Sequence, residues 1–163
     1  MLFEDTYKEI EHDSIGLYKE KGSKFIGYCY SVKNKNQVIE KLNSLKKKEK
    51  LANHYCYAYI LKPDKSECKA SDDGEPSSTA GKPILNQIKS KNLTNILIVV
   101  VRYFGGVKLG IPGLIRSYKS ASINAINKTK IVTKNIQEEY LLFFPYSFMN
   151  NVMRKIKEWD LNI

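Results

Sequence analysis

The residues between Val99 and Tyr118 combine glycines, cations and a proline in an order that suits the binding of an anion. The stretch reads VVVRYFGGVKLGIPGLIRSY and contains no acid. Glycines permit a tight turn or the close approach of another chain. A proline fits the first turn of a helix, where free N–H groups carry partial positive charge. We therefore predict an anion- or nucleic-acid-binding loop, which consists of Arg102, Gly105, Gly106, Lys108, Gly110, Arg116 and Lys119.

A second stretch, residues 71–83, reads SDDGEPSSTAGKP and is rich in acids and hydroxyl groups. Asp72, Asp73 and Glu75 could hold Mg²⁺ beside a phosphate. They could instead form ion pairs with the cations of the glycine-rich stretch, so that this loop is purely structural. The glycines match neither a Walker A motif nor the GxGxxG dinucleotide fingerprint. The sequence therefore leaves both interpretations of the acidic loop open and names no cofactor.

Two further residue types with chemical potential occur in the run HYCYAYIL, residues 54–61. Alternation along a strand places His54 and Cys56 on one face. They could form a nucleophile–base pair or half of a zinc site, but His12 is the only other histidine and no ligand spacing is recognisable. We favour core packing for both and predict neither a catalytic residue nor a metal site. The opposite face carries three tyrosines, which suit packing against a helix or base stacking: Tyr55, Tyr57 and Tyr59.

Hydrophobic periodicity places these motifs on a mixed α/β (α+β) framework. We expect a hairpin of strands 7–19 and 23–32 that turns at Lys21-Gly22. A long loop over 62–81 contains the acidic stretch. The remaining expected strands are 54–61, 94–104 and 138–144, and the expected helices are 34–50, 83–91, 111–129 and 147–159.

Composition limits the class of protein. The 163 residues suffice for one good-sized domain, and the net charge of +10 favours anionic partners. Three cysteines without a CxxC pair argue for a reducing compartment. The N-terminus lacks the apolar core of a signal peptide, and the longest aliphatic run, residues 96–101, is too short for a membrane span. We expect a soluble, cytoplasmic protein with no membrane contact.

Four motifs that occur in order resemble the YigZ/IMPACT family over about residues 7–130. They are KGSKFI at 21–26, HYCYA at 54–58, SDDGEP at 71–76 followed by TAGKPI, and RYFGGVKLG at 102–110. The resemblance implies a β-sheet with helices packed on it, like the second domain of a small-subunit ribosomal protein. That fold also occurs in domain four of elongation factor G and in GHMP kinases. The resemblance further implies a link to translation.

The same resemblance implies a division of the chain. Residues 1–132 resemble the Impact N-terminal domain. Residues 133–163 resemble only the opening strand and helix of the ferredoxin-like domain that bacterial members add. Such a fragment suggests a truncated domain, a homodimer formed through this segment, or a segment that packs on the first domain.

Three functional hypotheses follow. The first is a binding protein that contacts RNA or the ribosome through the glycine-rich loop. The second is a nucleotide-binding or phosphoryl-transfer enzyme with a GHMP-like fold. The third is a regulator of a stress-response translation pathway that acts through a protein partner.

Overall fold

The structure, a computed structural model, describes residues 5–163 and is built around a five-stranded antiparallel sheet of strand order β2-β3-β6-β4-β5. β6 lies in the middle because its aliphatic run is buried along almost its whole length. It pairs with β3 on one side, where Lys24 lies opposite Tyr103, and with β4 on the other, where His54 lies opposite Arg102. The strands are β2 (Ser14–Glu20), β3 (Ser23–Ser31), β4 (His54–Leu61), β5 (Glu67–Ser71) and β6 (Ile96–Tyr103).

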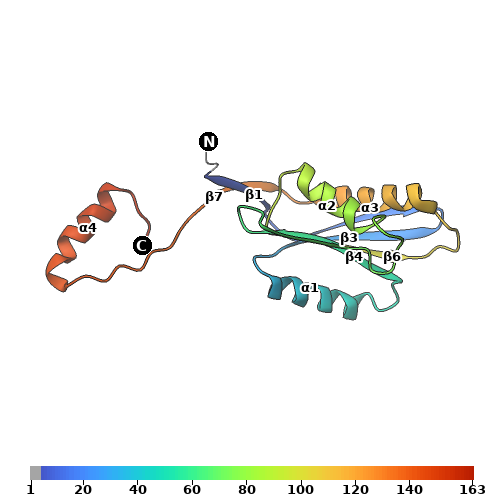
Figure 1. Ribbon diagram of the computed structural model, residues 1–163, viewed down its shortest axis with the longest axis horizontal. Coiled ribbons are helices and arrows are strands. Elements are labelled where there is room, and N and C mark those ends of the chain that lie inside the picture. The colour runs from blue at the N-terminus through green and yellow to red at the C-terminus, as the bar shows by residue number, and fades with distance from the viewer. Residues whose placement is uncertain (1–4) are drawn as a thin grey trace.

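Helices cover both faces of this sheet (Figure 1). α1 (Lys35–Lys48) lies on one face, and α2 (Gly81–Ser90) and α3 (Gly110–Ile126) lie on the other. The alternation predicted for β4 is confirmed, because Cys56 and Ala58 belong to the core beneath α2 and α3. Tyr59 belongs to the core on the α1 side, and the partly buried Tyr57 packs against that core. The mixed α/β class predicted from the sequence is therefore correct.

A two-stranded ribbon and a distant helix complete the chain. β1 (Thr6–Ile10) pairs antiparallel with β7 (Ile131–Asn135). After β7 an extended segment leads to the short 3₁₀ helix η1 (Tyr146–Phe148) and to α4 (Met149–Glu158), which lies away from the sheet in Figure 1. Among residues 5–163, no helix is both long and apolar enough to cross a lipid bilayer.

The structure differs from the sequence expectations at three places. The expected strand 7–19 is two strands, because residues 11–13 turn between them and the Asp13 carboxylate accepts the Ser31 N–H at 2.9 Å. The expected loop 62–81 contains β5, a mostly exposed edge strand whose side chains lack an apolar alternation. The expected strand 138–144 is absent from the described chain, which has no strand after β7. The domain division after residue 132 falls within β7 and stays a prediction.

Candidate functional site

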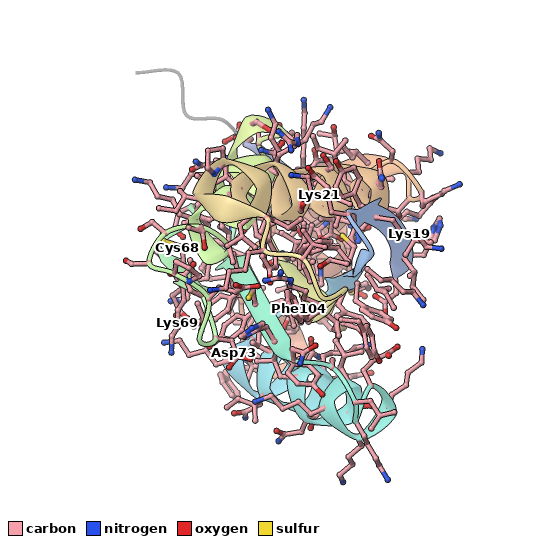
Figure 2. The ribbon with its side chains drawn as sticks, turned by 90° about the vertical axis from the view of Figure 1, so that its right-hand side faces the viewer. Lys19, Lys21, Cys68, Lys69, Asp73 and Phe104 are labelled. Carbon is pink, nitrogen blue, oxygen red and sulfur yellow. The ribbon has the colours of Figure 1, made fainter. Side chains whose placement is uncertain are left out.

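The glycine-rich loop packs directly against the turn of the β2–β3 hairpin. A Cβ at Gly105 would lie 1.9 Å from the carbonyl carbon of Gly22, so only glycine permits this approach. The Gly105 N–H also donates to the Ser23 hydroxyl at 3.1 Å. Gly106 adopts a φ of +88°, in the left-handed region, with open space around it. The contact of Gly105 with the hairpin turn therefore joins two turns that are some 80 residues apart in sequence into one end of the molecule, seen in Figure 2.

Arg102, at the end of β6, is buried in an ion pair. Its guanidinium donates from Nη1 to Oε1 of Glu75 at 2.6 Å, and both side chains are less than a tenth exposed. The Tyr118 hydroxyl, from α3, donates to the same carboxylate oxygen at 2.7 Å. The Cys56 thiol lies 3.3 Å from that hydroxyl. The Glu75 carboxylate thus links the acidic loop to β6 and α3, and the Tyr118 hydroxyl in turn contacts Cys56 of β4.

The other two acids of the loop bind backbone groups. Asp72 accepts from the N–H groups of Ala80 and Gly81 at 3.1 and 2.8 Å, which caps the start of α2. Asp73 accepts the Tyr55 N–H at 2.7 Å. Of the ion pairs considered from the sequence, the one between Glu75 and Arg102 forms. The structural interpretation of the acidic loop accounts for all three carboxylates, while a magnesium-binding role has no geometric support in these contacts.

A cavity of about 490 Å³ opens beside this ion pair. The start of α3 lines one wall with Leu109, Gly110 and Ile111, and Lys108 lies next to them. Phe104 and Asn53, which the sequence did not single out for binding, also line the cavity. Phe104 is 49% exposed and lies between α1 and α3 at the centre of Figure 2. In the sequence, the only sign that Phe104 belongs to the site was its place at the end of the expected strand 94–104, next to the glycine-rich loop.

His54 and Cys56 lie together near the ion pair. The carbonyl oxygen of Asp73 accepts from His54 Nδ1 at 2.8 Å, which places the proton on Nδ1. Nε2 then faces the Glu75 carboxylate at 3.9 Å. Burial raises the pKa of the Cys56 thiol well above its ordinary value, so Cys56 is a poor nucleophile. Within residues 5–163, no group of three or more His, Cys, Asp or Glu side chains is placed to hold a metal ion.

The remaining predicted cations differ in their surroundings. Arg116 pairs with Glu20, and its Nε donates to Glu20 Oε2 at 3.3 Å. This arginine lowers the pKa of the Glu20 carboxyl. Lys108 and Lys119 are exposed, and neither belongs to an ion pair within the described chain. Lys119 lines a separate depression between α2 and α3. The structure thus brings Arg102, Gly110 and Lys108 to one cavity, whereas Lys119 lies outside it.

Comparison with known proteins agrees with this architecture. Residues 21–126 match the model of the Impact N-terminal domain. The IMPACT family member YvyE of Bacillus subtilis is 33% identical over 153 residues, which cover 94% of this chain and 69% of that protein. The IMPACT family member YigZ of Escherichia coli is 36% identical over 111 residues, and the match spans 54% of its length.

A solved structure described as that of a hypothetical protein superposes with a TM-score of 0.82 and 28% identity. The superposition covers 96% of this chain and 77% of the other. The region that matches the family model contains strands β3 to β6 of the sheet, its three covering helices and all four sequence motifs. The chain therefore belongs to the IMPACT family.

Proposed function

We propose that the protein acts in the cytoplasm as a translation-associated RNA-binding protein, and that it contacts RNA with the end of the molecule where the β2–β3 turn meets the β6–α3 loop. The observation that carries this proposal is an aromatic ring among exposed cations. Phe104 is half-exposed, and Lys108 lies on the same loop. Lys19 and Lys21 belong to the adjoining hairpin (Figure 2). Aromatic rings that stack bases and cations that follow the phosphate backbone are the usual elements of single-strand recognition.

The proposed contact residues differ in part from the set expected from sequence. Arg102 binds Glu75 and is buried, so its role is to hold the acidic loop against β6. Lys108 and the hairpin lysines are exposed and are the groups available to phosphate. Gly105 shapes the surface by allowing the two turns to meet, and Gly106 follows it with a φ of +88°. The resemblance to a family linked to translation supports RNA or the ribosome as the partner.

The phosphoryl-transfer alternative gains no support from the acidic loop. Its mechanism needs a carboxylate that is available to a metal or to a substrate hydroxyl. Asp72 and Asp73 accept backbone N–H groups instead, and Glu75 accepts from Arg102 and Tyr118.

A specific observation favours a protein contact in addition. Residues 140–161 expose many large apolar side chains, among them Leu142 and Trp159, which line an apolar groove with α4. Exposed apolar surface of this kind favours association. We propose that this segment forms a homodimer contact, which sedimentation equilibrium of the wild-type chain and of a Trp159→Ser variant tests.

RNA binding is tested with the double variant Lys21→Asn/Lys108→Gln. Asparagine is chosen because residue 21 has a φ of +45°, which asparagine tolerates. The matched control is Lys128→Gln/Lys130→Gln, which removes two exposed lysines just beyond the C-terminal end of α3. That helix has 17 residues and separates the two ends by about 25 Å.

Fluorescence anisotropy with a labelled single-stranded RNA measures the affinity of each variant. The proposal expects the loop-end variant to bind weakly and the control to bind almost as wild type does. Equal affinity of both variants would contradict it, because a diffuse positive field would then explain the binding.

A further inference from the structure

The cavity beside Arg102 has the size and chemistry of a small-ligand site. Its volume of about 490 Å³ falls within the range of about 300–1,000 Å³ that ligand pockets occupy. One part of its lining is apolar, from Pro76, Ile111 and Leu114, and another part is polar, from Asn53, His54 and Glu75. An apolar lining with a few convergent polar groups is the usual composition of a ligand pocket.

One end of the cavity suits an anion. The residue before α3, Leu109, offers no side-chain cap, and the first turn of the helix contains no acid. The backbone N–H groups in the first turn of α3 are therefore left to other partners, except at Pro112, which has no N–H group. Lys108 adds a full positive charge at the same wall. Because Glu75 is already paired with Arg102, the wall as a whole favours a negatively charged group.

A second observation, independent of the helix end, also indicates a ligand. Arg102 lines the cavity, is only 6% exposed, and its Nε is buried with no hydrogen-bond partner in the described chain. Buried donors are nearly always paired, so an unpaired one needs an explanation. The guanidinium carbon lies 5.5 Å from the centre of the Phe104 ring. It lies equally far, 5.5 Å, from the Phe25 ring on the core side, so a planar polar group beside Phe104 would reach Nε once the arginine side chain moves.

We propose that this cavity binds a single nucleotide, with its phosphate at Lys108 and the start of α3 and its base against Phe104. The polar edge of the base would then face Asn53, His54 and Glu75. The Oδ1 atom of Asn53 accepts the Phe104 N–H at 2.8 Å. The amide NH₂ group of Asn53 is therefore the part of that side chain that could donate to a base. This inference rests on the proposed RNA-binding function, since it names the part of an RNA that the loop end recognises: an unpaired nucleotide.

Amide chemical shifts in the full chain test the inference at low salt. The probes are AMP, CMP and inorganic phosphate, each titrated separately. We expect AMP and CMP to cause saturable shifts at the amides of Phe104, Gly110 and Ile111. Phosphate should shift only the amides at the start of α3, and it should bind more weakly.

Two variants separate stacking from charge. Phe104→Leu keeps an apolar cover over Arg102 but removes the aromatic ring, whereas Phe104→Tyr keeps the ring. We expect Phe104→Leu to weaken AMP binding at least about fivefold and to leave phosphate binding unchanged. Phe104→Tyr should bind AMP as wild type does. The inference is overturned if neither nucleotide shifts the cavity amides, or if wild type and Phe104→Leu bind AMP equally.

A competition experiment shows whether the cavity takes a nucleotide that is part of an RNA strand or a free nucleotide. A hexamer of single-stranded RNA is added to the AMP-bound chain. Displacement of AMP supports both the cavity and the RNA-binding function. Retention of AMP identifies the cavity as a site for free nucleotides. That result contradicts the RNA-binding function but leaves nucleotide binding in the cavity standing.

Discussion

The buried pair of Arg102 and Glu75 should contribute strongly to the stability of the fold. The two side chains are 7% and 4% exposed, and the carboxylate also accepts from Tyr118. Replacement of Arg102 by methionine would keep much of the volume but leave the Glu75 carboxylate without its cation. Removal of one partner from a buried pair costs about 3–5 kcal/mol. For a chain of this size the cost corresponds to a fall of about 6–20 °C in Tm.

Thermal and urea unfolding followed by far-UV circular dichroism measure this loss. The matched control is Arg116→Met, because Arg116 also pairs with a glutamate but has a side chain that is 57% exposed. An exposed pair is weakened by solvent, so the control should lose less than a third as much stability. The double variant Arg102→Met/Glu75→Gln should be more stable than Arg102→Met alone, since no charge is then left unpaired. Equal losses for Arg102→Met and Arg116→Met would refute the reasoning.

Three further predictions concern the rest of the fold. Gly105→Ala should destabilise the fold more than Gly106→Ala in urea unfolding, because its Cβ would collide with Gly22 whereas Gly106 has open space; equal effects would contradict the docking of the two turns. In the native chain, one thiol of three should react with a disulfide reagent: Cys68 is exposed, whereas burial raises the pKa of Cys29 to about 12 and that of Cys56 still further. Burial raises the pKa of Glu9, but hydrogen bonds from Lys134, Lys33 and Asn95 hold it, on balance, below its ordinary value of 4.5. The stability that Glu9 contributes is therefore present above about pH 4.5 and lost as the pH falls through the lower folded-state pKa. Glu9→Gln should make the acid limb of a stability–pH curve shallower, and an unchanged limb would contradict this.

The sequence predicted the core of the fold well because its signals are local. The aliphatic run of β6 and the alternation in β4 each reflect burial of a whole strand face. The turn at Lys21-Gly22 was recognisable because glycine is the residue type that tight turns favour. In the structure Gly22 indeed adopts a φ of +80°. β5 was missed because an exposed edge strand carries no periodic apolar signal. Residues 138–144 have strand-like composition, but a strand also needs a partner, and sequence periodicity does not supply one.

The candidate site was only partly predictable. Spacing identified both motifs, and the interpretation that they bind each other is confirmed for Glu75 and Arg102. The sequence did not reveal that Asp72 caps α2, because that contact joins residues across the folded loop. Nor did it single out Tyr118 or His54 as partners of Glu75, since the packing of α3 and β4 alone brings them together.

The salt dependence of RNA binding tests the central claim most directly. Each phosphate contact contributes about 0.7 to the slope of log K against log salt for a single strand. Lys21→Asn/Lys108→Gln should therefore reduce the magnitude of the slope by about 1.4, and Lys128→Gln/Lys130→Gln should leave it unchanged. A slope that is the same for wild type and both variants would show that the loop end makes no phosphate contact and would contradict the account.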